Sequence, residues 1–72
     1  MTAQQLQSLH ELLFQCQSTA KVAHFAAEVS TAAGAEQTMR LKATHRADAL
    51  KWDRYGNTLR QAIAELEANP PT

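Results

Sequence analysis

Two heptad patterns, one on each side of Gly34, constrain the fold of this chain more than any other feature of its sequence. In the first half, apolar and small residues recur in alternating steps of three and four, at Leu6, Leu9, Leu13, Cys16, Ala20, Ala23 and Ala27. The second half shows the same alternation at Leu41, His45, Asp48, Trp52, Tyr55, Leu59, Ala62 and Leu66. Such spacing puts each set on one face of an α-helix. The patterns therefore predict two helices, and each set is the predicted seam of its helix.

Local signals set the ends of the first predicted helix. Thr2 and Gln5 have the spacing of a capping box, in which each side chain satisfies a backbone N–H of the other residue. Gly34 is expected to end the helix in the left-handed conformation, which glycine adopts without steric cost. The first helix is therefore predicted at about residues 2–31.

The second predicted helix spans about residues 35–68. Glu36 lies where an acid favours the positive end of a helix, and prolines at 70 and 71 stop the helix before a short disordered tail at 69–72. Gly56 raises an alternative, since Thr58 and Gln61 could cap a third helix. The seam keeps its phase across this glycine, and one glycine in a helix costs only about 1 kcal/mol, so a continuous or slightly kinked helix is favoured.

The two seams share one fold-back point. In an antiparallel arrangement centred on Gly34 they pair Leu6 with Ala62, Leu9 with Leu59, Leu13 with Tyr55, Cys16 with Trp52, Ala20 with Asp48, Ala23 with His45 and Ala27 with Leu41. Two helices joined by a short loop fold back in this way. The predicted fold is all-α, an antiparallel helical hairpin that forms one domain over residues 1–72.

Several apolar residues lie away from both predicted seams. They are Phe14, Val22, Phe25, Val29, Met39, Ala43 and Leu50. A single hairpin would expose them, and contiguous exposed apolar surface marks an interface. They would close a homodimeric four-helix bundle or bind a partner protein. Alternatively, the helices rotate along their length, so that Val29 packs on Met39 and Phe25 on Ala43.

Size and composition favour a small oligomeric protein. A chain of 72 residues builds a core that rarely supplies more than about 3–5 kcal/mol, so self-association is expected. Cys16 is the single cysteine, which excludes an internal disulfide and fits a reducing compartment. The sequence has no apolar run of membrane-spanning length and no signal-peptide pattern, so a cytoplasmic location is expected.

The sequence argues against catalysis. It contains no glycine-rich phosphate loop and no metal motif such as C-x-x-C or H-E-x-x-H. His24, His45 and Asp48 would approach one another in the hairpin, but this is a weak metal signal, and the three are better explained as surface and register-setting residues. Cys16 is expected inside the seam, where a thiol has no reason to ionise. Accordingly, no catalytic, cofactor-binding or metal-binding residue is expected.

Protein binding is the predicted function, as a dimeric adaptor or inhibitor. Trp, Tyr and Arg dominate interface energetics, and the predicted contact residues are Arg46, Lys51, Trp52, Arg54 and Tyr55. The alternative is an RNA-binding hairpin dimer. Net charge is zero, but six of the seven cations lie between Arg40 and Arg60. The architecture resembles the paired hairpins of plasmid copy control, which clasp RNA loops with cations on their helix faces.

One short segment resembles a known family. Residues 46–52 read Arg-Ala-Asp-Ala-Leu-Lys-Trp, which is similar to the second-helix motif of small phage-encoded anti-activators of quorum sensing. The resemblance covers about a tenth of the chain. It implies a dimeric helical hairpin that inhibits a host protein, with Trp52 at or near the contact.

Overall fold

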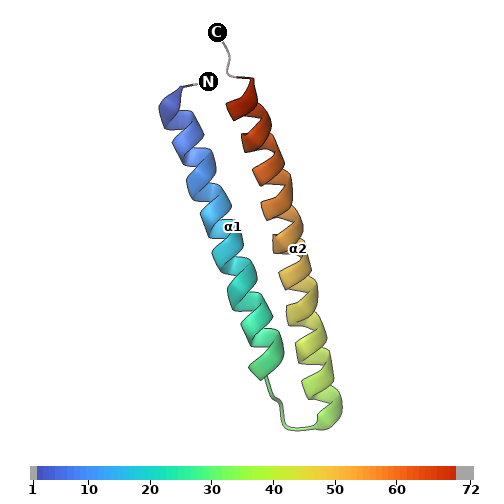
Figure 1. The fold of residues 1–72 in the computed structure, drawn as a ribbon. Coiled ribbons are helices and arrows are strands. Elements are labelled where there is room, and N and C mark those ends of the chain that lie inside the picture. Colours follow the sequence, from blue (N-terminus) through green and yellow to red (C-terminus); the bar gives the residue numbers. More distant parts are fainter. Residues whose placement is uncertain (1, 70–72) are drawn as a thin grey trace.

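A computed structural model describes residues 2–69 of the chain as two helices, α1 (Ala3–Val29) and α2 (Ala35–Ala68). The helices lie side by side and antiparallel, so that the start of α1 and the end of α2 share one end of the hairpin (Figure 1). The hairpin is 59 Å long and only 16 and 11 Å across. The all-α helical hairpin predicted from the sequence is confirmed, and helix α2 is continuous through Gly56.

Helix α1 begins at the predicted capping box. The Gln5 N–H donates to the Thr2 hydroxyl at 3.1 Å, and the Thr2 N–H donates to Oε1 of Gln5 at 2.8 Å. These bonds satisfy two backbone donors that a helix start leaves without partners. At the other end of the hairpin, α2 ends at Ala68, as predicted. The predicted tail at 69–72 lies outside the described residues apart from Asn69, whose N–H bonds the Glu65 carbonyl at 3.0 Å.

The loop at residues 30–34 differs from the prediction. Helix α1 ends at Val29 rather than at about residue 31, and Ser30 follows it with an extended backbone. Gly34 is also extended, at φ −135° and ψ 161°, so the predicted left-handed conformation is wrong; Gly34 is the N-cap of α2. A left-handed residue is not needed because α2 supplies polar groups to the end of α1.

Thr38 and Lys42 supply those groups. The Ala32 N–H donates to the Thr38 hydroxyl at 2.9 Å, and this hydroxyl donates to the Ala32 carbonyl at 3.3 Å. Nζ of Lys42 donates to the Glu28 carbonyl at 2.9 Å. Helix α1 has no basic residue in its own last turn. The Lys42 ammonium therefore places a cation from α2 at the negative end of the α1 dipole.

The seam of α1 is confirmed, and that of α2 is corrected. Cys16, Ala20 and Ala27 are buried in α1 as predicted, whereas α2 buries Ala49, Gly56 and Ile63. The predicted seam residues Asp48, Tyr55 and Ala62 are exposed, while Leu41, His45, Trp52, Leu59 and Leu66 are half-buried. From Asp48 onward, the seam keeps the residues His45, Trp52, Leu59 and Leu66, spaced seven apart. The predicted set Asp48, Tyr55 and Ala62 on one side of them is replaced by Ala49, Gly56 and Ile63 on the other.

The register changes with the seam. A Cβ on Gly56 would lie 3.9 Å from Cβ of Cys16 and 3.9 Å from Cδ1 of Leu13. Cys16 therefore faces Gly56 rather than Trp52, about one helical turn from the predicted pairing. Small residues are favoured at this position because they let α1 and α2 lie close together, whereas the larger Tyr55 lies at the surface.

Candidate interaction surfaces

The large apolar residues of this hairpin lie mostly outside its core. Among the described residues, the buried apolar set is Cys16, Ala20, Ala27, Ala49 and Ile63, so Ile63 is its one large side chain. The exposed large apolar residues are Leu12, Phe14, Val22, Phe25, Val29, Met39, Leu50 and Tyr55. Soluble single chains rarely leave so much of their apolar bulk in water. The surface, rather than the core, holds the apolar residues available for binding.

All seven residues predicted for the second apolar face are exposed. Phe14 is 69% exposed, Phe25 63% and Met39 71%. Val22, Val29 and Leu50 are more than half exposed, and Ala43 is also exposed. The alternative in which the helices rotate to pack Val29 on Met39 is therefore wrong for the single hairpin.

These seven residues form two stripes rather than one face. The α1 stripe consists of Phe14, Val22, Phe25 and Val29, and the α2 stripe of Met39, Ala43 and Leu50. Each stripe lies on the side of its helix away from its seam. Because the two seams face each other, the stripes point away from each other. One flat partner surface cannot cover both.

A third apolar surface lies along one long side of the hairpin. This aromatic groove is an open cavity of about 510 Å³ lined by Leu12, Cys16, Trp52, Arg54, Tyr55, Thr58 and Leu59. The Trp52 and Tyr55 rings meet edge to face, with centroids 5.5 Å apart and planes at 86°. Nζ of Lys51 lies 5.6 Å from the centroid of the Trp52 ring, within cation–π range. The groove therefore joins an edge-to-face aromatic pair to Arg54, and Lys51 lies over the Trp52 ring.

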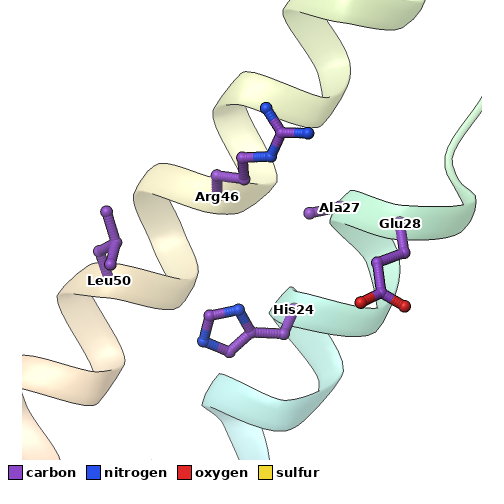
Figure 2. A pocket seen from close by; sticks show the side chains of 5 residues that line it. All are labelled: His24, Ala27, Glu28, Arg46 and Leu50. Atoms are coloured by element: carbon purple, nitrogen blue, oxygen red, sulfur yellow. The ribbon is translucent and has the colours of Figure 1, made fainter.

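The structure brings together four of the five predicted contact residues. Trp52, Arg54 and Tyr55 line the aromatic groove, and Lys51 lies over Trp52. Arg46 lies elsewhere, beside Leu50 and across from His24, Ala27 and Glu28 of α1 (Figure 2). The sequence did not point to Leu12, although its position one residue from the α1 seam and its apolar side chain were visible in the pattern.

The opposite long side of the hairpin is polar. Nε2 of His10 lies 3.1 Å from Oε1 of Glu67, and Nε2 of His24 lies 2.7 Å from Oδ2 of Asp53. All four side chains are about half exposed. At about 100° per residue these groups lie across the seam from Leu12 and Tyr55. The hairpin thus has an apolar side and a polar side, the latter defined by His10, His24, Asp53 and Glu67.

The structure does not bring together the residues considered for a metal site, and it buries Cys16. Within residues 2–69, no group of three or more His, Cys, Asp and Glu side chains is placed to hold a metal ion. His24 contacts Asp53 instead of forming the weak His24, His45 and Asp48 cluster considered from the sequence. Cys16 is buried against Gly56 rather than Trp52.

Three of the six clustered cations make polar contacts within the hairpin, and a fourth, Lys51, lies over the Trp52 ring. Arg40 pairs with Glu36 at 2.8 Å, Lys42 bonds the Glu28 carbonyl, and Nη1 of Arg60 lies 3.5 Å from Oδ1 of Asn57. Arg46 and Arg54 belong to different surfaces. A phosphate backbone is bound by many cations along one track, and this distribution does not favour that mode.

Comparison with protein-family models, with curated proteins and with solved structures finds no match to this chain. Neither helix, in the part of the chain that the structure describes, is long and apolar enough to cross a membrane.

Proposed function

We propose that this protein is a small non-enzymatic interaction module, a dimeric adaptor or inhibitor that binds and regulates another protein in the cytoplasm. The proposal rests on one observation: most of the large apolar side chains lie outside the buried core. Apart from Ile63, the buried side chains are small, while Phe14, Phe25 and Tyr55 are at least half exposed. Exposed apolar surface of this extent is typical of proteins that bind other proteins.

The α1 stripe is the surface proposed to bind the partner. Val22, Phe25 and Val29 follow the i, i+3, i+7 spacing by which an amphipathic helix enters an apolar groove. All three side chains are more than half exposed. Phe14 continues the stripe toward the open end of the hairpin. The partner is therefore proposed to be a protein with an apolar groove about four helical turns long, the length from Phe14 to Val29.

The inhibitory role rests on the resemblance of residues 46–52 to phage-encoded anti-activators of quorum sensing. An RNA-binding hairpin dimer remains the alternative proposal, with Arg46, Lys51 and Arg54 as its cations. Retention on RNA that falls steeply with salt and is weakened in Arg46→Ala would favour the alternative.

The experiment begins with capture of proteins from the cells that produce this chain. A captured protein is purified and titrated calorimetrically against wild type, Phe25→Ala and Trp52→Ala. Gln61→Ala, a change at an exposed position of α2 away from the α1 stripe, is the matched control. Phe25→Ala is expected to weaken binding at least tenfold, which is about 1.4 kcal/mol, and Gln61→Ala to leave it unchanged. Unchanged affinity in Phe25→Ala, with helicity retained, would contradict the α1 stripe as the binding surface. Unchanged affinity in both Phe25→Ala and Trp52→Ala would contradict the proposal as a whole.

A further inference from the structure

The aromatic groove is incomplete within one chain. Residues spaced seven apart in a helix form a row along it, and α2 has three adjacent rows of this kind that face α1 and the groove. The row that contains Ala49, Gly56 and Ile63 is buried against α1. The row of Trp52, Leu59 and Leu66 is half-buried, and the row beyond it, which contains Tyr55 and Ala62, is exposed. The apolar width of α2 therefore exceeds what α1 covers.

A face three rows wide is typical of a helix in a bundle. Two rows suffice for the seam between two helices, whereas a helix packed on two neighbours carries apolar residues in a third row. Helix α1 adds Leu12, which is 47% exposed, and Ala26, which is half-buried, on the same side. Both helices thus lack a neighbour on one common side of the hairpin.

We infer that a second copy of this chain packs on the aromatic groove, closing an antiparallel four-helix bundle with Trp52 and Tyr55 inside it. The inference takes the existence of the dimer from the proposed function. What it adds is the surface, the aromatic groove, through which the two copies pack. In a two-fold dimer the same surface is used by both copies. Each hairpin then supplies the two helices that the other lacks.

The surface area of the chain supports a second copy as the occupant. One chain exposes 5518 Å², whereas a compact monomer of 7.9 kDa is expected to expose about 4,400 Å². The excess of roughly 1,100 Å² exceeds the approximately 800 Å² that each partner buries in a standard interface. Pairing along the long side of the hairpin, rather than at its tip, would cover an area of this size.

The other surfaces fit a second copy less well. The polar side carries the His10–Glu67 and His24–Asp53 contacts, which packing would remove from water. The α1 and α2 stripes point away from each other, so no single pairing buries both. Of the three apolar surfaces described above, the aromatic groove is the one that residues of both helices line. His45 and Asp48 lie nearer the loop, beyond the residues that line it.

Trp52 is the single tryptophan of the chain and reports directly on this face. Wild type is diluted through the range in which its mass in sedimentation equilibrium falls from two chains to one. The expected result is a shift of Trp52 emission to longer wavelength with the same midpoint as the fall in mass. A fall in mass with constant Trp52 emission would overturn the aromatic groove as the dimer interface, although it would still show that the chain dimerises. A single-chain mass at every concentration would overturn both, while partner binding stays separately measurable by the titration described above.

Two matched variants test the same assignment independently. Tyr55→Glu places a charge in the groove, and Phe25→Glu places one on the α1 stripe. The dimer dissociation constant is expected to rise at least tenfold in Tyr55→Glu and to change less than twofold in Phe25→Glu, with the helical circular dichroism of both retained. The reverse order would assign the dimer to the outer stripes and overturn the inference. Should Tyr55→Glu lose helicity, the emission measurement on wild type decides.

Discussion

The two halves of the hairpin are built differently. Toward the open end, leucines Leu6, Leu9 and Leu13 share the seam with Leu59, Ile63 and Leu66, and most of them are half-buried. Toward the loop, Ala20, Ala27 and Ala49 are 3%, 4% and 0% exposed. The loop half is thus closely packed with little apolar bulk, and the open half has bulk that one partner helix does not fully cover.

Because of this difference, folding stability and binding of the partner protein depend mainly on different halves of the hairpin. Burial of apolar area contributes about 25 cal/mol per Å², so the larger side chains of the open half supply most of the hydrophobic stabilisation. The loop half relies on close approach and on the polar contacts of Thr38 and Lys42. Its own large side chains, such as Phe25 and Met39, face outward. We therefore expect core substitutions in the open half to affect folding and surface substitutions in the loop half to affect binding.

Ile63→Ala is expected to have the largest effect on folding. It removes the one large side chain buried among the described residues and should lower the free energy of unfolding by about 2 kcal/mol or more. Leu50→Ala, at a 61% exposed position of the loop half, should change it by less than about 0.5 kcal/mol. Urea denaturation followed by circular dichroism measures both. Equal losses of unfolding free energy in the two variants would contradict the proposed difference between the two halves.

Ala49→Leu tests the close packing of the loop half. Ala49 is fully buried, so three additional carbon atoms should force the helices apart and destabilise the hairpin by about 1–3 kcal/mol. The same change at exposed Ala47 is the control and should stay within about 0.5 kcal/mol. Thermal unfolding of the two variants gives the difference. If Ala49→Leu were as stable as Ala47→Leu, the loop half would not be closely packed.

Gly56→Ala is expected to stabilise the hairpin by about 0.5–1 kcal/mol. Alanine favours the helix over glycine, and its Cβ would make ordinary contacts at 3.9 Å with Cys16 and Leu13. Gly34→Ala should bring no gain, since an N-cap favours glycine over alanine and the new Cβ would meet Oε1 of Gln37. Chemical denaturation compares the two. A loss of stability in Gly56→Ala would show that the helices approach more closely than 3.9 Å there.

The polar side should contribute least. A double-mutant cycle with His24→Ala and Asp53→Ala is expected to give a coupling energy below about 1 kcal/mol, because both side chains are about half exposed to solvent. Denaturation of the wild type, two single variants and the double variant gives this value. A coupling of several kcal/mol would mean that the polar side, and not the open-half seam, holds the helices in register.

The sequence predicted the helices better than their register. The Thr2–Gln5 capping box and the α1 seam follow from local patterns, and the structure confirms both. On α2, the rows containing Tyr55 and Gly56 flank one shared row, and periodicity alone does not choose between them. The heptad spacing from Leu41 selects Tyr55, whereas Gly56 and Ala49 pack in the seam because they are small. Small residues can be assigned to a seam only when the facing helix is considered as well.

The candidate surfaces were predictable to the extent that they depend on one helix. Phe25 and Leu50 lie opposite a seam and are exposed for that reason. The aromatic groove and the His24–Asp53 contact depend on the register between helices, which was one turn from its actual value. Arg46 is close to Trp52 in sequence, but helical geometry places it on another side.

The central claim, that one hairpin is incomplete and is stabilised by a second copy, is tested most directly by the concentration dependence of its thermal unfolding. Circular dichroism of wild type is recorded over a hundredfold range of protein concentration. Because association stabilises the folded state by mass action, the account predicts a Tm that rises steadily with concentration. A helical protein whose Tm is the same across this range would contradict it.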